Sequence, residues 1–160
     1  MDATTLITLI DIGPRQMRVV TGYGSPSETT LDVALGSSIT AEQFFKSDLP
    51  TGRELEHAID AVEDQVMRLR TIVPAGSELV AAGGVLRELG HAASDAGRGG
   101  LVTLAMVEQV FQRIASTSLG DPMARQGLPG GNAFVASALI LREFMHHMGY
   151  ATVTVDAQMH

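Results

Sequence analysis

The beginning of the chain alternates apolar and polar residues in short runs, a pattern typical of β-strands. The runs cover residues 6–12, 15–24 and 29–35. Turn-forming residues separate them, Gly13-Pro14 after the first run and Gly24-Ser25-Pro26 after the second. Because both connections are short, we expect the three strands to form an antiparallel meander. A one-turn helix is expected next, over 41–45.

Apolar residues then recur at helical spacing. Thr51 and Glu54 form a capping-box motif, at which we expect a helix to begin. Its apolar positions follow one another at intervals of four and three: Leu55, Ile59, Val62, Val66 and Leu69. A short strand over 78–82 is expected after this helix, and it leads directly into Gly83 and Gly84.

The second half of the chain alternates expected helices with loops and a last strand. We expect a helix over 85–93, a glycine-rich loop over 94–100, an amphipathic helix capped by Thr103, a nearly all-apolar helix opened by 130–132 and stopped by Gly149, and a strand over 151–155. The resulting order of the main elements is βββαβααβ, with extra short helices in loops. We therefore expect one α/β domain over 1–157 and a tail over 158–160.

Composition limits the classes of function. The chain has 160 residues, 45% of them hydrophobic and 18% charged, as in an ordinary folded domain. It has no cysteine, which excludes disulfides, thiolate metal sites and a cysteine nucleophile. A formal net charge of −7 repels nucleic acid and anionic lipid, so we expect neither as a partner. The first residues lack the features of a secretory signal, and we expect the protein in the cytoplasm.

A succession of short segments resembles a known family. The segments are 9–13 (Leu-Ile-Asp-Ile-Gly), 35–37 (Leu-Gly-Ser), 81–84 (Ala-Ala-Gly-Gly), 128–131 (Leu-Pro-Gly-Gly) and 153–157 (Val-Thr-Val-Asp-Ala). Their order and intervals, over nearly the whole chain, resemble the second half of the catalytic region of the exopolyphosphatase/guanosine pentaphosphate phosphohydrolase family. The resemblance implies a ribonuclease-H-like half-domain of the actin-like ATPase and sugar-kinase superfamily, with one mixed sheet and helices on its faces.

The resemblance also implies a site. Asp11 matches the position at which the family holds a divalent metal, which would be magnesium. Gly13 begins its second phosphate loop, and Gly83 and Gly84 match its glycine pair. Arg15 and Arg18 lie beside the loop and could bind phosphate through their guanidinium forks. The implied ligands are polyphosphate or a guanine nucleotide.

Two departures from the family weaken this site. The loop continues as Pro14-Arg15-Gln16-Met17, where the family has further glycines and hydroxyl residues, and Pro14 has no amide to offer an anion. Val85 stands where the family usually has threonine. The resemblance also implies that the carboxylate which activates water comes from the other half of the catalytic region.

We therefore expect a non-catalytic or partner-dependent phosphoanion-binding or regulatory half-domain, working as a homodimer or with a partner protein. One alternative is a hydrolase of polyphosphate or guanosine pentaphosphate that acts as a dimer or with a separate first half. Another is a protein-interaction scaffold. No Ser-His-Asp, HExxH or Walker motif indicates a different chemistry.

Each candidate residue also has a purely structural interpretation. Asp11 could accept amide hydrogen bonds in the turn that follows it. The glycine pair could serve close packing of a strand on a helix. Arg15 and Arg18 could be solvated arginines at strand ends. The adjacent His146 and His147 point about 100° apart on a helix and would not bind one ion together, so we expect them to favour the helix dipole instead.

Overall fold

The computed structural model of the chain describes residues 6–46, 50–83, 101–118 and 131–155. The elements in chain order are β1 (Ile7–Ile12), β2 (Met17–Thr21), β3 (Thr29–Val33), α1 (Ser37–Phe44), α2 (Gly52–Met67), β4 (Glu78–Ala82), β5 (Leu101–Thr103), α4 (Leu104–Ser118), α5 (Asn132–Met148) and β6 (Thr152–Val155). Gly84, the predicted helix over 85–93, the predicted loop over 94–100 and the segments 128–130 and 156–160 lie outside the described residues.

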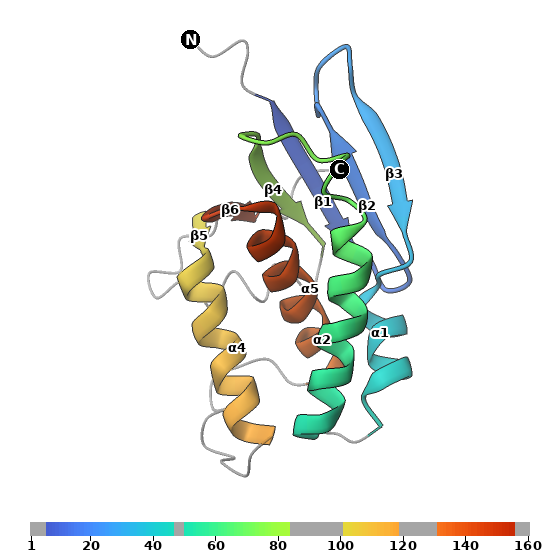
Figure 1. Ribbon diagram of the computed structural model, residues 1–160, viewed down its shortest axis with the longest axis vertical. Helices are drawn as coiled ribbons and strands as arrows, with labels where there is room; N and C mark the ends of the chain where they lie inside the picture. Colours follow the sequence, from blue (N-terminus) through green and yellow to red (C-terminus); the bar gives the residue numbers. More distant parts are fainter. Residues whose placement is uncertain (1–5, 47–49, 84–100, 119–130, 156–160) are drawn as a thin grey trace.

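Within the described residues, six strands form one mixed sheet in the order β3-β2-β1-β4-β6-β5 (Figure 1). The first three strands form the antiparallel meander that the sequence predicts. β4 pairs in parallel with β1 on one side and with β6 on the other. The strand β5, antiparallel to β6 at the sheet edge, was not predicted. It is only three residues long, which is too short for an alternating pattern to reveal it in the sequence, and Leu101 within it is 62% exposed.

The helices begin and end largely where local signals place them. In α2 the Thr51 hydroxyl accepts from the amide of Glu54, whose carboxylate accepts from the amide of Thr51, as the capping box predicts. The amide of Met106 donates to the Thr103 hydroxyl at the start of α4. Gly149 ends α5 in the left-handed conformation, with φ of 79°.

The extent of α1 was predicted wrongly. It runs from Ser37 to Phe44 rather than over 41–45. Its N-cap is Gly36, which has no side chain to cap the helix, so the usual start signal is missing. Backbone carbonyls from another part of the chain, the β1–β2 turn, take its first amides instead.

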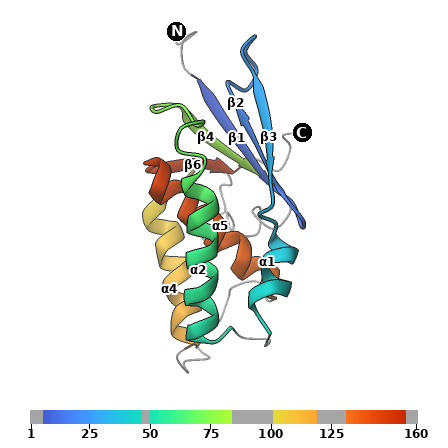
Figure 2. The same cartoon turned by 45° about the vertical axis from the view of Figure 1, so that its right-hand side comes forward.

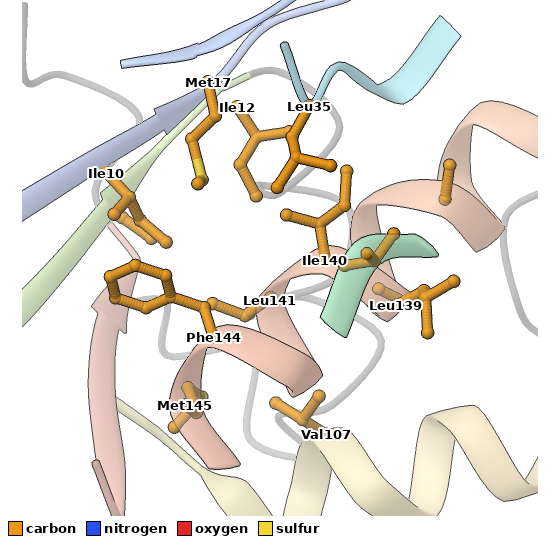
Figure 3. Packing of buried hydrophobic residues seen from close by; sticks show 14 of the residues in the cluster. Ile10, Ile12, Met17, Leu35, Val107, Leu139, Ile140, Leu141, Phe144 and Met145 are labelled. Carbon is orange, nitrogen blue, oxygen red and sulfur yellow. The ribbon is translucent and has the colours of Figure 1, made fainter. Parts of the chain in front are cut away.

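The main core lies between one face of the sheet and the described helices. Ile10, Ile12 and Met17 point from β1 and β2 toward Ile140 and Phe144 of α5 (Figure 3). The helix α5 is buried along Phe134–Leu141, as its apolar sequence predicts. It contacts α1, α2 and α4, and Figure 2 shows these helices gathered beside it. No helix in the described ranges is long and apolar enough to cross a membrane.

Candidate phosphate-binding pocket

The turn between β1 and β2 forms the floor of the candidate site. Ile12 and Met17 are opposite partners at the end of the two strands, and residues 13–16 connect them. The amide of Gly13 donates to the carbonyl oxygen of Gln16 at 2.9 Å, which closes the turn. Asp11 pairs with Arg18 one step back along the ladder. Both side chains therefore lie on the sheet face opposite to Ile10 and Ile12, outside the main core.

A pocket of about 230 Å³ opens beside this turn. It is lined by Asp11, Gly13, Gln16 and Arg18. The carboxylate of Asp11 is exposed, and it accepts no hydrogen bond from the described residues. Since the Gly13 amide bonds to Gln16 and Pro14 has no amide, the interpretation of Asp11 as a cap of this turn gains no support.

Gly83 lies beside Asp11 because β1 and β4 are parallel. Asp11 is the register partner of Ala82, so Gly83 follows at the same edge of the sheet. A β-carbon added at Gly83 would lie 2.8 Å from the Ile12 carbonyl oxygen and 3.7 Å from Oδ1 of Asp11. With φ of +129°, the position also requires a conformation that other residues rarely adopt. The structure thus places Asp11, Gly13 and Gly83 close to one another.

Arg18 is the cation of the pocket. Its Nε and Nη2 groups donate to the two carboxylate oxygens of Asp32 on β3, at 2.9 and 3.4 Å. The hydrogen bond with Asp32, and to a smaller extent the charge of Asp11, raise the pKa of the Arg18 guanidinium above its ordinary value. The same hydrogen bond lowers the pKa of Asp32. Arg18 therefore stays charged, and its Nη1 group makes no hydrogen bond with the described residues.

Arg15 is placed differently from Arg18. Its guanidinium lies 3.8 Å from the carboxylate of Glu42 on α1, and both side chains are about two-thirds exposed, at 67% and 68%. Arg15 is not among the residues that line the pocket. Of the two arginines considered from the sequence, the structure brings Arg18 to the pocket and points Arg15 to α1.

The turn also supports the start of α1. The carbonyl oxygen of Gly13 accepts from the amide of Ser37 at 2.9 Å, and that of Pro14 accepts from the amides of Ser38 and Ile39 at 2.9 and 3.0 Å. These are the amides that a helix N-terminus could otherwise present to an anion. The N-terminus of α1 is therefore not available to hold an anion in the pocket.

Comparison with known proteins identifies solved structures that share the fold of this chain. No protein-family model and no curated protein sequence matches the chain. Among solved structures, the Ppx/GppA phosphatase of Aquifex aeolicus is 16% identical, with a TM-score of 0.74 over 96% of this chain and 53% of that one. The chain has the fold of half a Ppx/GppA phosphatase. This is the actin-like ATPase fold that the sequence predicts.

Other structures of this kind agree with that result. An exopolyphosphatase from Cytophaga hutchinsonii is 13% identical, with a TM-score of 0.70 over 96% of this chain and 53% of that one. An exopolyphosphatase-like protein is 12% identical, with a TM-score of 0.73, over 94% and 55% of the two chains. The chain thus spans about half the length of each of these structures, and the resemblance is confirmed in the fold.

Proposed function

We propose that the chain is a non-catalytic or partner-dependent half-domain that binds a phosphate-containing anion in the pocket beside the β1–β2 turn. The observation that carries this proposal is the meeting of an exposed carboxylate, Asp11, and a charged guanidinium, Arg18, around one pocket. Gly83 adds backbone without a side chain next to Asp11. A guanidinium with an unoccupied Nη1 group suits the geometry of phosphate oxygens.

The residues present also fit a magnesium ion. Mg²⁺ is commonly held by one or two carboxylates, with waters and substrate phosphates as its remaining ligands. Asp11 supplies one such carboxylate, and the pocket leaves room for the other ligands. When bound, the ion would neutralise phosphate charge. Polyphosphate and guanine nucleotides are the ligand classes that we propose, and Gly84 belongs to the proposed phosphate site together with Gly13 and Gly83.

The pocket does not favour catalysis by one chain alone. Asp11 is the one carboxylate among its described lining residues, and hydrolysis needs a further base to activate water. The turn also presents few amides, because that of Gly13 is taken by Gln16 and Pro14 has none. The second candidate function is therefore a hydrolase whose base comes from a second copy or from a separate first half.

A thermal-shift panel with polyphosphate, guanosine tetraphosphate and ATP, each with and without Mg²⁺, separates the candidates. A ligand at a hundredfold excess over its Kd stabilises the folded state by about 2.7 kcal/mol, which raises Tm by roughly 5–10 °C in a domain of this size. We expect a shift without phosphate release. Phosphate release would favour the hydrolase, and no shift with any ligand would contradict the proposal and favour a protein-interaction scaffold.

A further inference from the structure

Three side chains able to bind metal meet where α2 packs against α5, in a cluster separate from the lining of the pocket. Glu143 and His147 are one turn apart on α5, and Glu63 comes from α2. One ligand atom of each lies within 4.8 Å of the other two. The His147 Nε2 atom is 3.1 Å from Oε2 of Glu63 and 3.3 Å from Oε1 of Glu143.

Two carboxylate oxygens approach the same imidazole nitrogen of His147, which is more than this nitrogen can bind by hydrogen bonds. Nε2 offers either one N–H or one lone pair, so it cannot make a good hydrogen bond to both carboxylates at once. The two distances match the edges of a tetrahedral zinc site, which are roughly 3.3 Å for metal–ligand bonds of about 2.0–2.1 Å. We propose that Glu63, Glu143 and His147 bind a Zn²⁺ ion, with water as the fourth ligand.

Neighbouring side chains orient the carboxylate of Glu143 toward His147. The residue is 3% exposed, and its Oε2 accepts from Nη1 of Arg142 at 2.8 Å, which leaves Oε1 directed at His147. Arg142 is fixed in turn by a salt bridge to Glu108 and by the ring of Phe111, whose centroid is 4.7 Å from the guanidinium carbon. Outer partners of this kind orient metal ligands and strengthen binding.

Charge and access also suit a divalent ion. Among the described residues, the salt-bridged cluster contains three carboxylates, those of Glu63, Glu108 and Glu143, and the guanidinium of Arg142. A dication balances that excess of negative charge. The Glu63 side chain is 42% exposed, so an ion and a water molecule can reach the cluster from solvent. An imidazole with two carboxylates suits Zn²⁺, whereas Mg²⁺ prefers oxygen ligands in an octahedron.

Isothermal titration of the full chain, free of any affinity tag, with ZnCl₂ tests the proposal. The variants are Glu63→Gln and His147→Gln, with His146→Gln as the matched control because His146 is the adjacent exposed histidine and lies outside the cluster. We expect one zinc ion per chain. Its Kd should rise by at least about tenfold in each cluster variant and stay unchanged in the control, since loss of a ligand costs at least as much as loss of an outer partner.

Cobalt gives a readout that a purely structural salt-bridge cluster would not produce. Co²⁺ in the same site should show the intense visible absorption of tetrahedral cobalt, and the absorption should disappear in His147→Gln. Circular dichroism confirms that each variant is folded. The proposal is overturned if the wild-type chain does not bind zinc, or if Glu63→Gln and His147→Gln bind it as tightly as the wild type does.

Discussion

Replacing Gly36 by alanine tests how closely α1 is held against the turn that forms the pocket. A β-carbon at Gly36 would lie 2.4 Å from the carbonyl oxygen of Pro14 and 2.5 Å from the carbonyl carbon of Arg15. Both are backbone atoms, which cannot rotate away as the end of a side chain could. To restore ordinary contact, the helix and the turn must separate by about 1 Å.

That separation would also stretch the hydrogen bonds between the turn and the helix. The amide of Ser37 donates to Gly13, and the amides of Ser38 and Ile39 donate to Pro14. Overpacking costs about 1–3 kcal/mol, and weakening bonds that are each worth about 1 kcal/mol adds to that cost. We therefore expect Gly36→Ala to lower the free energy of unfolding by about 3 kcal/mol.

Urea denaturation followed by circular dichroism measures this loss. Gly52→Ala is the matched control, because it makes the same chemical change at the first residue of α2, where no atom lies within 4 Å of the added β-carbon. We expect the control to be as stable as the wild type or up to about 1 kcal/mol more stable. If Gly36→Ala is as stable as the control, the packing of α1 on the turn is not as described.

Two further predictions concern pH and self-association. The amides of Thr51 and then Lys46 lower the pKa of Glu54 below its usual 4.5, so the stabilisation from this charged carboxylate is present above that pH and is lost as the pH falls through the lower folded-state pKa. The wild-type chain should therefore unfold at a higher urea concentration than Glu54→Gln at neutral pH. A difference between the two urea midpoints that is just as large in acid would refute this prediction. Since the chain has the fold of half a larger protein, we also expect a two-fold homodimer at micromolar concentration. Sedimentation equilibrium checks this, and a monomer mass at the highest concentration would disprove it.

The parts of the fold that sequence predicts well are those fixed by local chemistry. The capping box of Thr51 and Glu54 marks the start of α2, because its two hydrogen bonds join residues three apart. The strand Glu78–Ala82 has the bounds that its apolar run predicts. Gly149 adopts the left-handed conformation that ends α5, a choice that depends on the absence of a β-carbon.

The parts that sequence misses depend on distant contacts. The start of α1 is fixed by carbonyls of the β1–β2 turn, which are more than twenty residues away along the chain, as for the bond from Ser37 to Gly13. The strand β5 exists because β6 pairs with it. The cluster around His147 was missed because Glu63 comes from another helix, although Glu143 and His147 already stand at the i, i+4 spacing of helix neighbours.

The sequence indicates some residues of the candidate site but not all of them. Asp11, Gly13 and Gly83 follow from the order of strand, turn and glycine, and the parallel pairing of β1 with β4 brings them together. Arg18 is also a candidate from the sequence because it lies beside the loop, and the four-residue turn sets it opposite Asp11 on the same face of the hairpin. Gln16 lines the pocket through the geometry of the turn, for which the sequence gives no separate signal.

Titration calorimetry with polyphosphate and Mg²⁺, on the wild type and on Arg18→Gln and Arg15→Gln, tests the central claim most directly. Arg15 lies in the turn and Arg18 follows it on β2, and both are exposed, but among the described residues only Arg18 of the two lines the pocket. We expect binding to the wild type, a Kd at least about tenfold higher in Arg18→Gln, and a smaller change in Arg15→Gln, because a charge-assisted phosphate contact is worth about 1.5–3 kcal/mol. Binding that Arg18→Gln leaves unchanged, or that Arg15→Gln weakens equally, would contradict the pocket as the phosphate site.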